Sequence, residues 1–90
     1  MPIIVEKYSR SQLESIPEKK FLLKEDLCMY HFTLLLRSKI RLNKADALFL
    51  FVNGYDILKC DTLIKEVYNT YKDPDGFLYF KYHDKGSFGA

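Results

Sequence analysis

Ala47-Leu48-Phe49-Leu50-Phe51-Val52, followed by Asn53-Gly54, is the stretch of this 90-residue chain that decides the fold. Six apolar residues in succession, with no polar alternation, are typical of a strand that is covered on both faces. The Asn-Gly pair that follows supplies the chemistry of a tight turn. We therefore expect a central strand here, in a fold that provides cover on both sides of it.

Three further strands are predicted around this one. Residues 3–8 are β-branched and aromatic at their start, and residues 77–82 follow the strong turn signal Asp73-Pro74-Asp75-Gly76. Residues 20–24 contain an apolar segment flanked by lysines. Because lysine commonly protects the open edge of a sheet, we expect this last strand to be an edge strand.

Two helices complete the pattern. Asp26 can cap a helix over residues 27–41, and a second helix can start at Asp61 or Thr62 and run to Tyr71. The first helix carries an apolar stripe that suits packing on a sheet, and Leu34 and Leu35 widen this apolar face beyond the stripe. The stripe consists of Met29, Phe32, Leu36 and Ile40.

The order of these elements is strand, strand, helix, strand, helix, strand. Such an order predicts the α+β class, as a four-stranded mixed sheet curled around the main helix with a second short helix, the ubiquitin-like β-grasp arrangement. A chain of 90 residues has room for one domain, residues 1–90. Residues 84–90 are then expected to form a flexible C-terminal tail.

Composition excludes several classes of protein. The net charge of +2 is too small for the basic stripe of a nucleic-acid-binding protein. Residues 1–6 lack the basic lead of a signal peptide, and the apolar run at 47–52 is far below the ~20 residues of a membrane-spanning helix. Cys28 and Cys60 are too far apart for a CxxC pair, so we expect reduced thiols in a soluble cytosolic protein.

The chain ends in Ser87-Phe88-Gly89-Ala90. A glycine one residue from the C-terminus has no side chain to obstruct a narrow enzyme channel, so its carboxylate suits activation by another enzyme. The alternative is a frayed end with no function, because termini are commonly disordered.

Taken in order, several segments resemble the ubiquitin-like autophagy modifiers, the family of the GABA-receptor-associated protein and the microtubule-associated light chain. The resemblance covers essentially residues 2–90, although family members normally carry two short helices before the first strand and this chain begins at that strand. The segments that carry the resemblance are Pro2-Ile3-Ile4-Val5-Glu6-Lys7, Lys19-Lys20-Phe21-Leu22, Asp26-Leu27, Phe32 with Leu35 and Arg37, residues 46–53, Asp75-Gly76-Phe77-Leu78-Tyr79 and Phe88-Gly89.

This resemblance implies a role as a substrate and adaptor, with no catalytic residues, metal or cofactor of its own. A processing cysteine protease would remove Ala90, and E1-like activating and E2-like conjugating enzymes would join the Gly89 carboxylate to phosphatidylethanolamine. The protein would then be cytoplasmic before conjugation and bound to the autophagosomal membrane after it. A two-chain lipid would supply membrane affinity that the polar surface lacks.

The resemblance also implies a docking site for cargo receptors that carry a short motif, an aromatic residue followed three positions later by an aliphatic one. Such a peptide would add a strand to the exposed edge, where Leu22 supplies backbone. The aromatic pocket would be built from Pro2, Ile4, the Lys20 stem and Phe77, and the aliphatic pocket from Phe21, Leu23, Leu27, Phe32 and Leu35. Lys20 and Lys39 could receive acidic residues that flank the motif.

Other readings stay open. The chain could be the sister autophagy modifier that is joined to a protein, or a β-grasp interaction domain that is never conjugated. Phe32 and Leu35 on a helix could equally be core residues. His31, His83 and the two cysteines have no spacing that predicts a catalytic pair or a metal site, and Asp73-Pro74-Asp75-Gly76 is a tight turn rather than a calcium loop.

Overall fold

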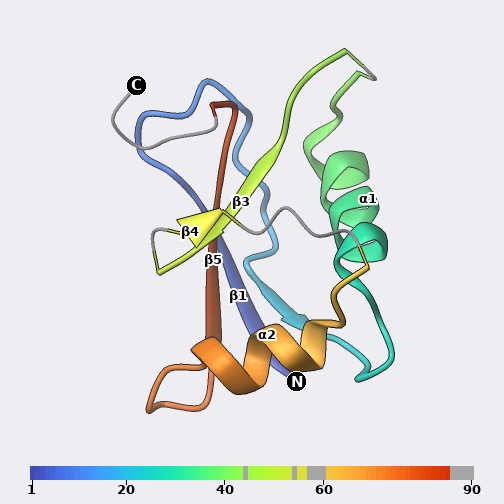
Figure 1. The fold of residues 1–90 in the computed structure, drawn as a ribbon. Helices are drawn as coiled ribbons and strands as arrows, with labels where there is room; N and C mark the ends of the chain where they lie inside the picture. Colours follow the sequence, from blue (N-terminus) through green and yellow to red (C-terminus); the bar gives the residue numbers. More distant parts are fainter. Residues whose placement is uncertain (44, 54, 57–60, 86–90) are drawn as a thin grey trace.

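The structure is a computed structural model in which residues 1–43, 45–53, 55–56 and 61–85 are described, with the side chains of residues 55 and 56 excepted. These residues form a five-stranded sheet in the order β2-β1-β5-β3-β4, with two helices (Figure 1). In chain order the elements are β1 Pro2–Lys7, β2 Lys20–Leu22, α1 Met29–Ile40, β3 Phe49–Val52, β4 Tyr55–Asp56, α2 Ile64–Tyr71 and β5 Leu78–His83.

The sheet is mixed, as predicted. β1 and β5 run parallel in the middle, with Val5 opposite Phe80, and the other three pairings are antiparallel. The four expected strands are confirmed, and the two-residue strand β4 extends the sheet beyond β3. β3 is therefore an interior strand with a short outer neighbour, and its Leu50, Phe51 and Val52 are buried on both faces.

The core lies between the sheet and the helices. The predicted stripe of α1 is buried: Met29, Phe32, Leu36 and Ile40 are at most 2% exposed. The Phe32 ring lies 5.6 Å from the Phe80 ring of the middle strand, measured between ring centroids. Leu34 and Leu35 remain exposed, which confirms that the apolar face of α1 is wider than its buried stripe. Among the described residues, no helix has the length and apolar character needed to cross a membrane.

Both helices begin later than the sequence predicts. Asp26 does not cap α1, whose N-cap is Cys28 without a side-chain hydrogen bond, and α2 starts at Ile64 rather than at Asp61 or Thr62. The reason is a backbone pairing between the two helix starts, centred on an isolated bridge between Cys28 and Leu63. The Met29 N–H donates to the Thr62 carbonyl and the Ile64 N–H donates to the Leu27 carbonyl, both at 2.8 Å. These bonds satisfy N–H groups at the helix starts that a side-chain cap would otherwise serve.

The turn before β5 is confirmed. The Gly76 N–H donates to the Asp73 carbonyl at 2.9 Å, and Gly76 has a φ of 88°, which glycine adopts without strain. β5 then begins at Leu78, one residue later than expected.

The connection between β1 and β2 is polar but firmly held. Ile16 is 4% exposed within it. The Tyr82 hydroxyl donates to the Glu14 carbonyl at 2.6 Å, and the Val5 N–H donates to the Lys19 carbonyl at 2.7 Å. This segment is therefore positioned against the sheet although it contains no regular element.

Candidate functional site

β2 forms one edge of the sheet, as the lysines in its sequence predict. It pairs with β1 only, with Ile3 opposite Phe21 and Ile4 opposite Lys20. Beyond its last residue the pairing continues, because the Leu23 N–H donates to the Met1 carbonyl at 3.1 Å and the amino group of Met1 donates to the Leu23 carbonyl at 3.0 Å. The other side of β2 is not paired with any strand among the described residues.

The ladder fixes which backbone groups of β2 face outward. Lys19 and Leu23 bond toward β1, and in an antiparallel pair alternate residues point their N–H and C=O groups to the same side. The N–H and C=O groups of Lys20 and Leu22 therefore point away from β1. We call this open row of backbone groups, together with the side chains around it, the β2 edge.

One cluster of predicted site residues lies on the sheet face that points away from the core. Ile3 and Val5 are buried in the core, so Pro2 and Ile4 point to the opposite face. Lys20 is opposite Ile4 in the ladder, and its Nζ lies 5.0 Å from the centroid of the Phe77 ring. Pro2, Ile4 and Phe77 are half-buried. The structure thus brings all four residues of the expected aromatic pocket, Pro2, Ile4, Lys20 and Phe77, onto one surface, which we call the outer cluster.

The residues of the expected aliphatic pocket lie on the helix side of the same edge, and we call them the helix-side cluster. Leu23 and Leu27 are half-buried against the core, and Leu35 is 37% exposed on α1. Phe21 is 8% exposed and packs edge to face on Phe32, with 5.9 Å between ring centroids. Phe32 is fully buried, so it can support this cluster from below but presents no surface of its own.

Lysine side chains border both clusters. Lys39 lies 2.9 Å from the Glu18 carboxylate, and its Nζ is 5.8 Å from the centroid of the Phe21 ring. Lys20 covers the Phe77 ring on the other face. The β2 edge is therefore flanked by cations, one of which already has an acidic partner.

The sequence did not indicate that Tyr79 belongs to the site, but it lies on the outer face beside Phe77, with 6.3 Å between ring centroids. Its hydroxyl donates a short hydrogen bond to Asp75, which also accepts the Phe77 N–H at 2.8 Å. The hydrogen bond to Asp75 raises the pKa of Tyr79 to about 12, and the same bond lowers the pKa of Asp75. The two-residue spacing of Phe77 and Tyr79 in one strand is the signal that could have identified Tyr79.

The remaining candidate positions from the sequence are the C-terminal glycine and alanine, and the histidines and cysteines. Gly89 and Ala90, the expected conjugation and cleavage positions, lie outside the described residues. The Cys28 sulfur is 3.1 Å from His31 Nδ1, a proximity that sequence spacing did not suggest. No group of three or more His, Cys, Asp or Glu side chains among the described residues could hold a metal ion.

Comparisons with known proteins give one consistent result. The family model described as "Autophagy protein Atg8 ubiquitin like" matches residues 1–89. Autophagy-related protein 8i of Arabidopsis thaliana is 38% identical over 99% of this chain and 76% of its own length. Microtubule-associated protein 1 light chain 3 gamma of Homo sapiens is 34% identical over 100% of this chain and 62% of its own length. The crystal structure of Trypanosoma brucei ATG8 superposes with a TM-score of 0.88 at 37% identity, over 99% of this chain and 76% of that one.

Proposed function

The chain belongs to the Atg8 family of ubiquitin-like autophagy proteins, and from this we propose that it is a lipid-linked modifier that recruits cargo receptors. Members of this family are ubiquitin-like modifiers rather than enzymes. In the proposed cycle a protease removes Ala90, and activating and conjugating enzymes join Gly89 to phosphatidylethanolamine on the autophagosomal membrane. The β2 edge then binds receptors through the motif of an aromatic residue and an aliphatic residue three positions later.

The observation that carries the receptor-binding part is the position of the two clusters on opposite faces of one sheet edge. Successive side chains of a strand point to opposite faces, so residues separated by three positions also point to opposite faces. A peptide added beside β2 would place its aromatic residue on the outer cluster and its aliphatic residue on the helix-side cluster. A motif with a spacing of two or four would direct both side chains to the same face.

The backbone of the edge supports the same mode of binding. Lys20 and Leu22 direct their N–H and C=O groups away from β1, where an added strand would bond to them. Leu22 is 78% exposed, so its side chain does not obstruct this approach. The lysines beside the clusters would attract acidic residues that flank the motif, which affects register and association rate more than affinity.

A peptide pair tests the spacing directly. Binding of the blocked peptide Asp-Asp-Trp-Ser-Thr-Leu-Gly to the 90-residue chain is measured by calorimetry, with Asp-Asp-Trp-Ser-Leu-Thr-Gly as a control of identical composition and even spacing. We expect the first peptide to bind at least about tenfold more tightly, because only its spacing serves both faces. Equal affinities would contradict the proposed binding mode.

The substitution Leu22→Pro tests the backbone contribution. Proline removes the N–H that points away from β1 and leaves the bonds to β1 intact, a position that edge strands tolerate. We expect Leu22→Pro to lose binding of the motif peptide while retaining cooperative unfolding, and Leu22→Ala to bind like the parent chain. A Leu22→Pro variant that folds and binds normally would exclude strand addition at this edge.

Conjugation is tested separately. The chain ending at Gly89 is incubated with Atg8-type activating and conjugating enzymes, ATP and liposomes containing phosphatidylethanolamine, beside a Gly89→Ala version. We expect a lipid-linked product only with glycine. Absence of that product with the Gly89 form would exclude the lipid-linked modifier, whether or not the peptide binds.

A further inference from the structure

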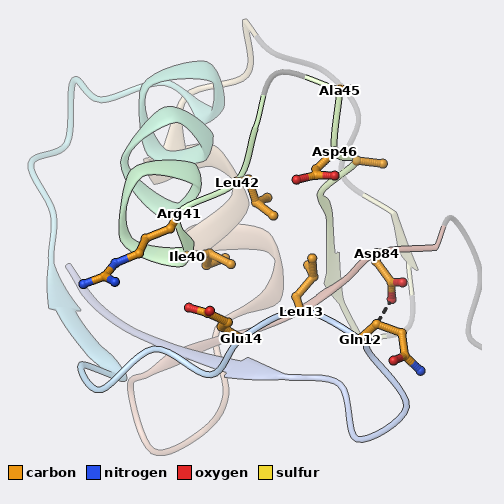
Figure 2. Close-up of a pocket in the computed structure, with 10 residues that line it drawn as sticks. Gln12, Leu13, Glu14, Ile40, Arg41, Leu42, Ala45, Asp46 and Asp84 are labelled. Carbon is orange, nitrogen blue, oxygen red and sulfur yellow. Dashed lines mark hydrogen bonds between the residues drawn. The ribbon is translucent and has the colours of Figure 1, made fainter.

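A pocket of about 480 Å³ lies where β5 ends and β3 begins, at the opposite end of the strands from the part of β1 that pairs with β2. Phe77 lies just before β5, at the end of this strand that is near the β2 edge. Asp84 follows β5 at its other end and lines the pocket. The other walls come from the connection after β1, the C-terminal end of α1 and the segment before β3 (Figure 2). Its volume falls in the range of ligand-binding sites, about 300–1,000 Å³.

Aliphatic side chains form one part of the lining of this pocket. Leu13 and Leu42 project into it from the β1–β2 connection and from the end of α1 (Figure 2). Both are half-buried against the hydrophobic core, and Ile40 beneath them is 2% exposed. This aliphatic part of the lining therefore rests on packed core residues.

The rim is acidic. Glu14, Asp46 and Asp84 place carboxylates around the opening, whereas the guanidinium of Arg41 points away from it (Figure 2). Backbone N–H groups hold two of these carboxylates in position: Asn43 donates to Asp46 at 3.0 Å and Gln12 donates to Asp84 at 3.2 Å.

The hydrogen-bond partners of these carboxylates bear on what the pocket can bind. Glu14 makes no side-chain hydrogen bond or ion pair within the described part of the chain. Burial opposes ionisation of Asp84, but hydrogen bonds from the Gln12 N–H and other neighbours leave its pKa below the ordinary value. This lowered pKa favours the charged form of Asp84 at neutral pH.

We propose that this pocket binds an arginine or lysine side chain, flanked by apolar residues, from a basic segment of a partner protein. The aliphatic stem of such a side chain fits against Leu13 and Leu42, and its cation meets the carboxylates of the rim in charge-assisted hydrogen bonds. Phosphate groups and acidic peptides are repelled by the same rim. The site is independent of the β2 edge, which is bordered by lysines and selects the opposite charge.

The test uses the blocked peptide Gly-Ser-Leu-Arg-Leu-Ser-Gly and amide chemical shifts of the 15N-labelled 90-residue chain at low salt. We expect saturable shifts at Leu13, Leu42 and Asp46, and no such shifts with glutamate in place of the arginine. Added salt should weaken binding, since the charges at the rim are open to solvent. Equal shifts with the glutamate peptide would overturn the proposal.

A double variant, Glu14→Gln with Asp46→Asn, removes two charges while keeping the side-chain shapes and an acceptor for the Asn43 N–H. We expect binding of the arginine peptide to weaken about tenfold, with the thermal unfolding midpoint nearly unchanged. Glu66→Gln removes an exposed carboxylate on α2, a helix that contributes no residue to the pocket, and should bind like the parent chain.

Two outcomes of these measurements would also overturn the proposal. The first is an equal loss with Glu66→Gln, which would mean that only the total charge matters. The second is a shift of the pocket amides with protein concentration in the absence of peptide, which would identify the occupant as a second copy of this chain.

Discussion

The two ends of the sheet present surfaces of opposite character. At one end the β2 edge offers backbone groups, two apolar clusters on opposite faces and the cations Lys20 and Lys39. At the other end lies a pocket that contains the aliphatic side chains of Leu13 and Leu42 and is bordered by Glu14, Asp46 and Asp84. The net charge of +2 conceals this separation, because it sums a basic and an acidic surface. A small net charge therefore excludes a single large charged patch but not two local ones.

The two surfaces also depend on the core in different ways. Both surfaces rest on α1. The β2 edge is supported by Phe32 and the pocket by Ile40, and these two residues lie two turns apart in the same buried stripe. In the proposed binding modes, the edge would gain its specificity from strand geometry, whereas the pocket would gain it from side-chain charge. Substitutions can therefore alter one surface while the other reports whether the fold is intact.

The largest effect is expected for Phe32→Ala, which removes the support of the helix-side cluster. The ring is fully buried between those of Phe21 and Phe80, so its loss should lower the free energy of unfolding by about 3–5 kcal/mol, measured by urea denaturation. The exposed neighbour Leu34→Ala should change stability by less than about 0.5 kcal/mol. A small effect for Phe32→Ala would mean that the edge does not rest on the core.

At the other end of α1, Ile40→Val deletes one methylene beneath the pocket. We expect a loss of about 0.5–1.5 kcal/mol in the free energy of unfolding, from the same urea measurement. The motif peptide should bind to the β2 edge as before, and the arginine peptide should bind less tightly. Equal weakening of both peptides would show that the two surfaces are coupled through α1.

A smaller effect is expected for Glu18→Gln, which frees Lys39 from its acidic partner. Because the two side chains are 29% and 60% exposed, the ion pair should contribute less than about 0.5 kcal/mol to stability. Calorimetry should show about two- to threefold tighter binding of a motif peptide with acidic flanking residues, and added salt should remove this gain. No gain at low salt would mean that Lys39 does not meet these flanking residues.

The smallest effect is confined to the extremes of pH. Tyr79 has its pKa raised to about 12 by its hydrogen bond to Asp75, so its contribution to stability is complete below pH 10 and is lost as the pH rises toward about 12. The pKa of Asp75 is lowered, so its contribution is present above pH 3.8 and is lost as the pH falls further. In Tyr79→Phe the urea midpoint should vary less with pH in both windows. Superimposable pH profiles of the parent and variant would contradict this hydrogen bond.

Local sequence patterns predicted most of the fold. The uninterrupted apolar run of β3, the stripe of α1 and the lysines of β2 each lie within one segment, and each was confirmed. The predicted starts of both helices were wrong. The N–H groups at the observed starts are satisfied by the pairing between Leu27–Cys28 and residues 62–64, which is a contact between distant segments. No local pattern of capping residues can reveal such a bond.

The candidate sites show the same limit. Family spacing indicated the residues that the structure gathers at the β2 edge, but only the sheet register reveals that they form two clusters on opposite faces. Family spacing also did not reveal that Phe32 is fully buried. The acidic pocket joins residues 12–14, 40–42, 45–47 and Asp84, which no sequence spacing connects.

The parallel pairing of β1 with β5 has a mechanical consequence. A receptor held at β2 and a membrane anchor beyond Asp84 would pull on opposite ends of this strand pair. The force would act along the strands, so the evenly spaced hydrogen bonds between them would carry the load together instead of separating one after another. The domain would then resist tension between cargo and membrane along the axis on which its proposed function places it.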